Sequence, residues 1–261
     1  MSRSITVSVD VSNPGQFFAC CGLLELADRM QDEGVARPTG YFVNASFELR
    51  DVQHSVSTLI ERLAKCQPSS DPSGDAGDSL ASLELPCVRL RLDWWREPNG
   101  RKEPFRKTAF KLWAGQQTSR SIYATLRTAV ATLLSNNRIA DVAPFRARAS
   151  LTGRFGFDPG AAWNALDAGF SPNEQGYSVS SSPVVELLSA IGLQRFRPAA
   201  VDGDRDAFEY VAWGVPLPVV VAAAAAAGVI HDPNARRFRF RVVSRGSYGS
   251  FTSATEIVRS P

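Results

Sequence analysis

Histidine is scarce in this sequence. Only His54 and His231 occur among the 261 residues, and neither stands near a pair of acidic residues. The H-x-H and H-E-x-x-H spacings of metal-dependent hydrolases are absent. The phosphate-binding pattern G-x-x-x-x-G-K-[ST] is absent as well. These absences argue against a metal-dependent nuclease and against an ATPase, and they predict a protein without catalytic residues, metal or cofactor.

Cysteine is also scarce, with four residues and no C-x-x-C spacing of a zinc site. Cys20 and Cys21 are adjacent, which makes them poor disulfide partners for each other. Their neighbours are apolar, and an apolar setting raises the pKa of a thiol. We therefore expect both to be buried small side chains, with a thiol-dependent enzyme as the alternative.

No apolar run is long enough to span a bilayer, because the longest, at residues 219–230, is short and rich in alanine. The N-terminal residues 1–11 alternate apolar and polar and lack the apolar block of a signal peptide. We expect a cytoplasmic protein with reduced thiols and no membrane partner.

Regular patterns in the sequence predict both strands and helices. Alternation with a period of two predicts strands at residues 5–11, 41–50, 88–94 and 236–245. Capping residues and apolar periodicity predict helices at residues 17–27, 56–65, 183–193 and 218–227, and another that begins at Thr118 or Ser119. Because the two types do not alternate regularly, we expect an α+β fold with a mixed or antiparallel sheet and packed helices. The whole chain, 1–261, is predicted to be a single domain with a mobile acidic loop at 67–82.

Positive charge is concentrated in one part of the chain. The net charge is only +3, yet residues 96–148 carry eleven Lys or Arg against three acids. The first half of this stretch is broken by Pro and Gly, which predicts a long surface loop at residues 96–117. Candidate contacts to nucleic acid here are Trp95, Arg101, Lys102, Arg106, Lys107, Lys111, Gln116, Gln117 and Arg120.

The chemistry of this segment suits a polyanion. Cations at short intervals neutralise phosphates, indole rings stack on exposed bases, and amide groups can reach base edges. The alternative is a solvated basic loop whose tryptophans belong to the core.

A second basic pattern lies in the last predicted strand. Arg237, Arg239 and Arg241 share one face, while Phe238 and Phe240 share the other. Same-face residues are spaced about 6.6–7 Å apart, which is comparable with phosphates along a single strand. The alternative is an edge strand that its charges protect from aggregation.

Several unusual strings resemble one protein family. They are Asn13-Pro14-Gly15-Gln16-Phe17-Phe18-Ala19-Cys20-Cys21-Gly22, Asp93-Trp94-Trp95, Trp113-Ala114-Gly115-Gln116-Gln117, Trp163-Asn164-Ala165-Leu166-Asp167, Ser171-Pro172-Asn173-Glu174-Gln175-Gly176 and Ala190-Ile191-Gly192-Leu193-Gln194-Arg195-Phe196. Together they resemble the third family of the Csb series from type I-G (formerly I-U) CRISPR loci, a short homologue of the large subunit.

The resemblance implies a non-catalytic, DNA-binding subunit of a crRNA-guided effector complex. Its partners would be the backbone and crRNA-processing subunits, crRNA, target double-stranded DNA and a separate helicase-nuclease. Large subunits of such complexes usually read the protospacer-adjacent motif. The hypothesis that Gln116, Gln117, Asn173 and Gln175 face the bases is our own. The rival interpretation is a purely structural subunit, which docks its partners through the apolar helix and the basic loop without touching DNA.

Overall fold

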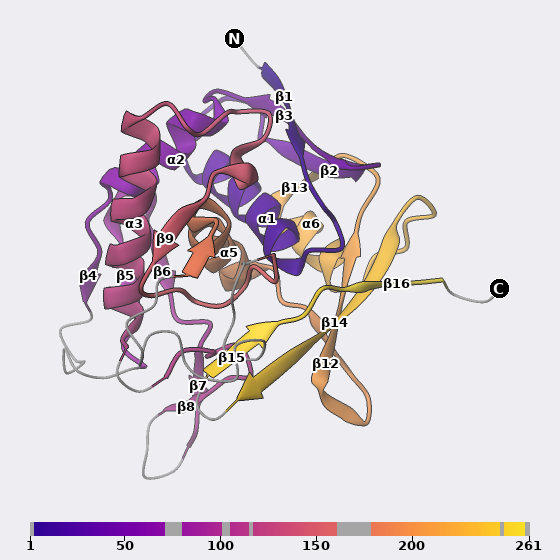
Figure 1. Cartoon of the computed structure of the whole chain (residues 1–261). Coiled ribbons are helices and arrows are strands. Elements are labelled where there is room, and N and C mark those ends of the chain that lie inside the picture. The colour runs from indigo at the N-terminus through magenta and orange to yellow at the C-terminus, as the bar shows by residue number, and fades with distance from the viewer. Residues whose placement is uncertain are drawn as a thin grey trace.

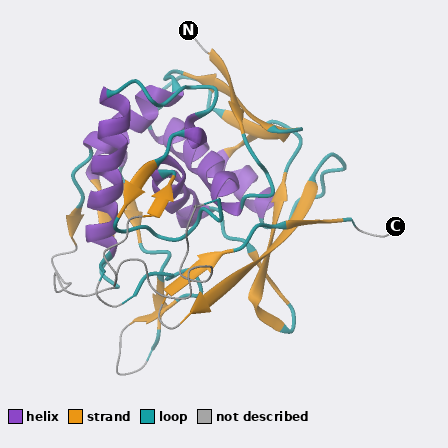
Figure 2. Ribbon diagram, in the orientation of Figure 1, coloured by secondary structure: helices purple, strands orange, loops and turns teal. Residues whose placement is uncertain are grey.

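The computed structural model describes residues 3–70, 80–100, 105–114, 117–160, 179–245 and 248–258. Within these ranges the helices are α1 (Pro14–Arg29), α2 (Val56–Lys65), α3 (Ser119–Ser135), α5 (Pro183–Arg195) and α6 (Val219–Ala226), with short 3₁₀ turns η1 (Pro86–Val88) and η2 (Pro144–Arg146). Figures 1 and 2 show α1 and α5 in the middle of the molecule, with α2 and α3 on one side and the two larger sheets on the other.

Two sheets carry most of the strand residues. One has the order β1 (Arg3–Ser8), β3 (Ser46–Val52), β2 (Thr39–Val43) and β13 (Leu217–Pro218). The other has the order β11 (Ala199–Val201), β12 (Asp204–Ala212), β14 (Arg236–Arg245) and β15 (Tyr248–Phe251), with β16 (Thr255–Ile257) also paired to β14.

The remaining strands form three small sheets. They are β4 (Ser69–Ser70) with β5 (Leu83–Leu85) and β6 (Leu90–Leu92), β7 (Arg96–Pro98) with β8 (Phe105–Lys107), and β9 (Ala149–Leu151) with β10 (Val179–Ser181). Every strand pair of the described residues is antiparallel. With helices packed on these sheets, the predicted α+β class is confirmed.

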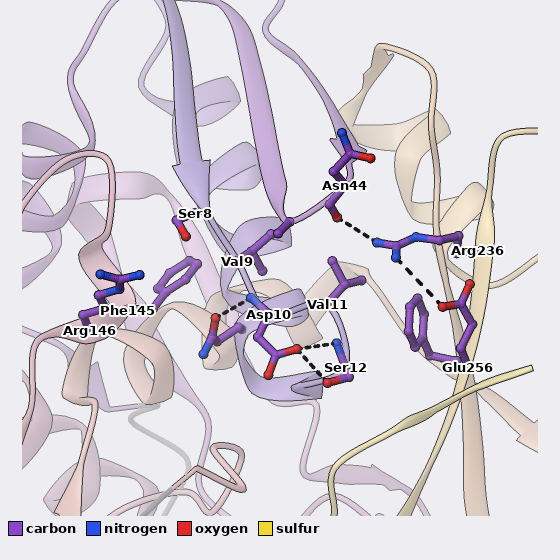
Figure 3. Close-up of a pocket in the computed structure, with 13 residues that line it drawn as sticks. Ser8, Val9, Asp10, Val11, Ser12, Asn44, Phe145, Arg146, Arg236 and Glu256 are labelled. Atoms are coloured by element: carbon purple, nitrogen blue, oxygen red, sulfur yellow. Dashed lines mark hydrogen bonds and ion pairs between the residues drawn. The ribbon is translucent and has the colours of Figure 1, made fainter.

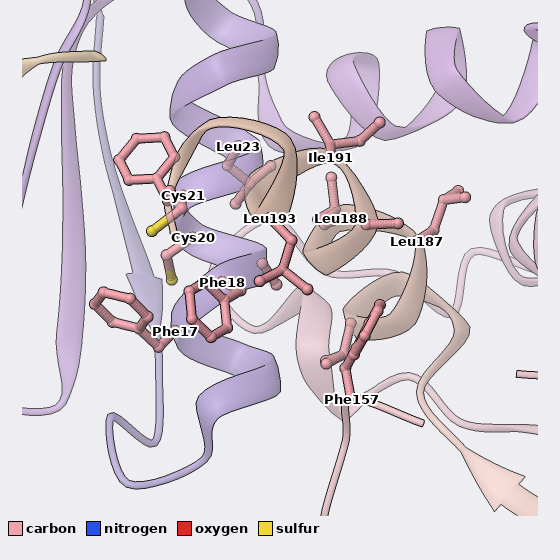
Figure 4. Close-up of a cluster of buried hydrophobic side chains, with 14 of the residues drawn as sticks. Phe17, Phe18, Cys20, Cys21, Leu23, Phe157, Leu187, Leu188, Ile191 and Leu193 are labelled. Carbon is pink, nitrogen blue, oxygen red and sulfur yellow. The ribbon is translucent and has the colours of Figure 1, made fainter. Parts of the chain in front are cut away.

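The central feature is the close crossing of α1 and α5, both of which are buried nearly all round. Glycine makes this crossing possible. A Cβ added at Gly22 would overlap the carbonyl oxygen of Leu188, and a Cβ added at Gly192 would overlap that of Phe18. The two helix backbones therefore touch directly, with Phe17, Phe18 and Leu188 filling the space around the crossing (Figure 4).

The start of α1 follows the sequence signal. The side chain of Asn13 accepts a hydrogen bond from the Gln16 amide at 3.1 Å, and Pro14 occupies the first helical turn. A Gln at the third helical position can reach back to the cap residue, as in a capping box, but the Gln16 side chain does not. Its Oε1 accepts instead from the Asp10 amide at 2.9 Å, so it fixes the chain before the helix.

The strand predicted at 41–50 is two strands. The chain turns at Asn44 and Ala45, and β2 and β3 pair as a hairpin. Asn44 takes the left-handed conformation, with φ of 52°, which a short polar side chain tolerates. One continuous strand would place Val43 and Phe47 on the same face, but the turn reverses the chain between them, so Val43 is exposed and Phe47 is buried.

The ends of the loop predicted at 67–82 belong to the folded body. Ser69–Ser70 form β4, and the carbonyls of Leu80 and Ala81 accept hydrogen bonds from Trp95 and Ser119. Ser82 is fully buried. The predicted loop is therefore shorter than 67–82, and its centre, 71–79, lies outside the described residues.

Cys66 and Cys87 form a disulfide, with their Cα atoms 5.8 Å apart. The prediction of reduced thiols is therefore wrong for these two residues. Cys66 caps the C-terminus of α2 and Cys87 lies in η1, so the bond ties the helix to the small sheet of β4, β5 and β6. Their separation of 21 residues in sequence gave no spacing signal, because only the fold brings them together.

Removing this disulfide should weaken the fold. For a closed loop with a sequence separation of 21, the Cys66→Ala/Cys87→Ala variant should lose about 3 kcal/mol of unfolding free energy. Urea titration of both proteins measures the difference. The urea midpoint of wild type treated with reductant should lie close to that of the variant. If oxidised wild type and the variant had equal midpoints, the bond would not be stabilising.

Candidate nucleic-acid interface

The tryptophans of the basic segment lie in the core. Trp94 and Trp95 are 0% exposed and Trp113 is 2% exposed. The three rings contact one another edge to face, and the indole N–H of Trp95 donates to the carbonyl of Leu80 at 3.3 Å. The prediction that Trp95 stacks on bases is therefore wrong, because a ring sealed inside the fold presents no face to a ligand.

The strings that carry the family resemblance meet in this core. The indole N–H of Trp94 donates to the carbonyl of Ala190 on α5 at 2.9 Å. Gln194 of α5 forms two hydrogen bonds with Asp93, one from the Asp93 amide and one from its own side-chain N–H to Oδ1, both 2.9 Å long. These strings thus join one another, and their described parts form scaffold rather than a binding surface.

The segment predicted as a surface loop at 96–117 contains a β-hairpin, β7–β8, which lies at the edge of the molecule away from β1 (Figure 1). Arg96 lies opposite Lys107 in the register, and Pro98 lies opposite Phe105. Because side chains alternate along a strand, Arg96, Phe105 and Lys107 share one face of the hairpin. The guanidinium of Arg96 lies 4.0 Å from the centre of the Phe105 ring.

The opposite face of the hairpin carries one ion pair. Arg106 Nε lies 2.9 Å from Glu97 Oε1, with side chains 64% and 45% exposed. An exposed pair of this kind contributes about 0–1 kcal/mol, so a phosphate can replace the carboxylate at little cost. Lys107 is exposed and makes no ion pair within the part of the chain that the structure describes. We call Arg96, Phe105, Arg106 and Lys107 the hairpin surface.

Other predicted residues of the basic segment are occupied inside the protein. Lys111 donates to the carbonyl of Trp113 at 2.8 Å and lies over its ring, and burial together with Lys107 lowers the pKa of its ammonium group. Gln117 donates to the carbonyl of Thr152 at 3.2 Å. Arg120 is exposed on the first turn of α3 and also has an interaction within the chain. The side-chain donors of Lys111 and Gln117 are thus already used within the protein.

Five predicted contacts lie outside the described residues. They are Arg101, Lys102, Gln116, Asn173 and Gln175. Arg101 and Lys102 belong to the segment that connects β7 to β8, so they adjoin the hairpin in sequence.

The arginines of β14 are neutralised by the neighbouring strand. Glu209 of β12 accepts from Arg237 at 3.0 Å and from Arg239 at 2.6 Å, and Asp204 accepts from both terminal nitrogens of Arg241. The hydrogen bond from Arg241 lowers the pKa of Asp204. Burial raises the pKa of Glu209, but its arginine partners outweigh this effect and lower the pKa overall. Cross-strand carboxylates thus already pair with the three arginines that the sequence suggests for phosphates, and a contact of these cations with nucleic acid stays a prediction.

Sequence reasoning missed Arg96 and Phe105 as members of a shared surface. Strands of three residues, of which one ends at Pro98 and the other begins directly after Pro104, are too short to show a period of two. The sequence signal for this surface is the aromatic residue next to Arg106.

The two cysteines that a thiol-dependent enzyme would use lie in the core. Cys20 and Cys21 are fully buried, and burial raises the pKa of both thiols well above the ordinary value; the charge of Cys20 raises that of Cys21 further. Such thiols are poor nucleophiles.

Among the residues described, no cluster of three or more potential metal ligands occurs, and no helix is both long and apolar enough to cross a membrane.

Comparison with known proteins adds no relative. A scan against protein-family models and searches of curated proteins and of solved structures give no match for this chain.

Proposed function

We propose that this chain is a non-catalytic, DNA-binding subunit of a type I CRISPR effector complex and that it contacts DNA phosphates through the hairpin surface. The assignment to such a complex rests on the resemblance of the strings in the sequence. Base pairing by the guide RNA would supply most of the sequence specificity, while this subunit would contribute to reading the protospacer-adjacent motif and to recruiting the helicase-nuclease.

One observation carries the DNA contact. Arg96 and Lys107 share a hairpin face with the half-buried ring of Phe105, and neither cation forms an ion pair with a carboxylate of the described residues. Cations beside an aromatic ring combine phosphate neutralisation with a surface on which a base can stack. Arg106 on the reverse face is held only by an exposed carboxylate. On the hairpin, Lys107 is exposed without an ion pair among the described residues, Arg106 has only an exposed partner, and one terminal nitrogen of Arg96 donates to the carbonyl of Leu80 at 3.2 Å.

The salt dependence of DNA binding tests this surface. Replacing Arg106 and Lys107 by Ala should reduce the magnitude of the slope of log K against log salt by about 0.9 for each phosphate that is no longer neutralised, or about 1.8 in total. Filter binding of duplex DNA to the full chain over a range of salt concentrations gives the slope. Lys111 is left in place, because its ammonium group is held by Trp113.

The chain provides a matched control on β14. Arg239→Ala/Arg241→Ala removes the same number of positive charges from a surface that Glu209 and Asp204 already neutralise. This variant should keep the wild-type slope. If the two double variants changed the slope equally, only net charge would matter and the hairpin would have no special role.

A second candidate function is a purely structural subunit. The helix expected to dock partners, α1, is buried in the core and cannot do so. Large apolar side chains are nevertheless exposed elsewhere, with Val220 at 66%, Val229 at 77% and Val258 at 87%. The Arg106→Ala/Lys107→Ala variant tests whether the two roles are separate. If this variant co-purifies with the other subunits but does not bind DNA, the hairpin surface serves DNA contact and is not needed for assembly.

A further inference from the structure

A polar cavity of about 570 Å³ lies where the two larger sheets meet. Its walls come from residues 8–12, the first turn of α1 at Gln16, the β2–β3 turn, η2, β14 and β16, six segments of the chain (Figure 3). None of its lining residues belongs to the hairpin surface. The volume falls within the range of about 300–1,000 Å³ that is typical of pockets for small ligands.

Asp10 lies in the middle of this cavity in a fixed orientation (Figure 3). Its amide donates to Gln16 Oε1 at 2.9 Å, and its Oδ1 accepts from the amide of Ser12 at 3.0 Å and from the Ser12 hydroxyl at 2.6 Å. Its second oxygen, Oδ2, makes no hydrogen bond to any described residue. The cavity thus presents a pre-oriented carboxylate oxygen that can accept from a ligand hydroxyl.

Two arginines flank Asp10 from opposite sides (Figure 3). Arg236 donates to the carbonyl of Asn44 at 2.9 Å and lies 3.9 Å from a carboxylate oxygen of Glu256, so it is partly neutralised. Arg146 is exposed, and no carboxylate of the described chain lies within ion-pair distance of it. A guanidinium presents a planar set of donors that matches a phosphate. Arg146 is therefore a cation of the cavity without an ion-pair partner among the described residues.

We propose that this cavity binds a phosphorylated ribose, either as a free ribonucleotide or as one nucleotide of an RNA strand. Arg146 pairs with the phosphate and Asp10 Oδ2 accepts hydrogen bonds from the ribose hydroxyls. A carboxylate recognises vicinal ribose hydroxyls in many nucleotide sites. Because DNA lacks the 2′-hydroxyl, this contact selects ribose over deoxyribose. The cavity is thus a second nucleic-acid site, separate from the hairpin surface.

Calorimetric titration of the full chain tests the proposal, with adenosine 5′-monophosphate, its 2′-deoxy analogue and a short oligoadenylate RNA as probes. Wild type should prefer ribose to deoxyribose by about tenfold, since the analogue cannot make one hydrogen bond to a charged group. Asp10→Asn should abolish this preference, and Arg146→Gln should weaken both monophosphates alike. Arg138→Gln, which removes an exposed cation outside the cavity, should change nothing.

The probes also separate the two sources of the ligand. Binding of the monophosphate identifies a free nucleotide, whereas binding of the oligonucleotide alone identifies an RNA strand. Failure of both ribose probes to bind wild type would overturn the proposal, as would binding that neither Asp10→Asn nor Arg146→Gln alters. Arg106→Ala/Lys107→Ala should leave the monophosphate titration unchanged, so this result is independent of the proposed DNA contact.

Discussion

Replacing both Arg29 and Arg195 by Met should lower the free energy of unfolding by about 3–5 kcal/mol, because it leaves a buried carboxylate without a partner. That carboxylate is Glu25, which is only 2% exposed in the middle of the fold. Arg29 Nε and Arg195 Nε each lie 2.6 Å from one of its oxygens. The three side chains join the end of α1 to the end of α5. Urea denaturation followed by circular dichroism measures the decrease.

A third substitution shows whether the unpaired charge is the cause. Adding Glu25→Leu to the double variant removes the carboxylate, and apolar replacements of buried ion pairs are often neutral or stabilising. The triple variant should therefore be more stable than the double variant. Recovery should stay incomplete, because Arg29 also donates to the carbonyls of Val88 and Arg89. A triple variant less stable than the double variant would show that the arginines act by packing alone.

Gly22→Ala and Gly192→Ala should each destabilise the protein by about 3 kcal/mol or more, at or above the upper end of the usual cost of overpacking. The new methyl group at each position would overlap a carbonyl oxygen of the facing helix, and backbone inside two buried helices has little room to move. Thermal and urea unfolding of both variants would show the decrease in stability.

The sign of this effect separates helix packing from helix propensity. In the interior of a helix without a close neighbour, Gly→Ala stabilises by about 1 kcal/mol. Neither glycine has a positive φ angle that would strain alanine. A gain in stability would therefore show that the two backbones are not in contact, whereas a decrease supports the direct crossing of α1 and α5. Ser121→Ala is a poor control, since this side chain completes the capping box of α3.

Local signals in the sequence predicted the main helices well. The N-cap residues Asn13, Thr118 and Ser182 each accept a backbone hydrogen bond at the start of a helix. Helix α2 and strand β14 have the predicted bounds, because apolar periodicity marks both and Ser55 caps the start of α2. These features depend on residues only a few positions apart, which a single sequence displays directly.

Features that depend on distant residues could not be predicted. The neutralisation of Arg239 depends on Glu209, thirty positions away and opposite it only in the paired sheet. The disulfide depends on η1 lying at the end of α2. The burial of Trp95 depends on a core that several segments build together. In each case the sequence identifies the residue itself, but it does not show which distant residue contacts it in the fold.

The candidate site shows the same limit. Cationic residues near position 106 could be recognised from the sequence, whereas the face shared by Arg96, Phe105 and Lys107 needs the register of β7 and β8. The unusual strings that suggested a family are largely those that hold α1, α5 and the tryptophans together. A likeness carried by such strings is therefore a likeness of scaffold, and the binding surface has to be established independently.

The bond between Cys66 and Cys87 also changes the covalent connectivity of the chain. Residues 67–86 form a closed ring, so cleavage of one peptide bond inside it opens the ring without separating the N-terminal part from the C-terminal part. The helices α1 and α5, which lie on either side of this ring in sequence, would remain one molecule. After one such cleavage, the part of the core that contains α1 and the part that contains α5 would still be covalently joined. The effective concentration of each part for the other would therefore not change.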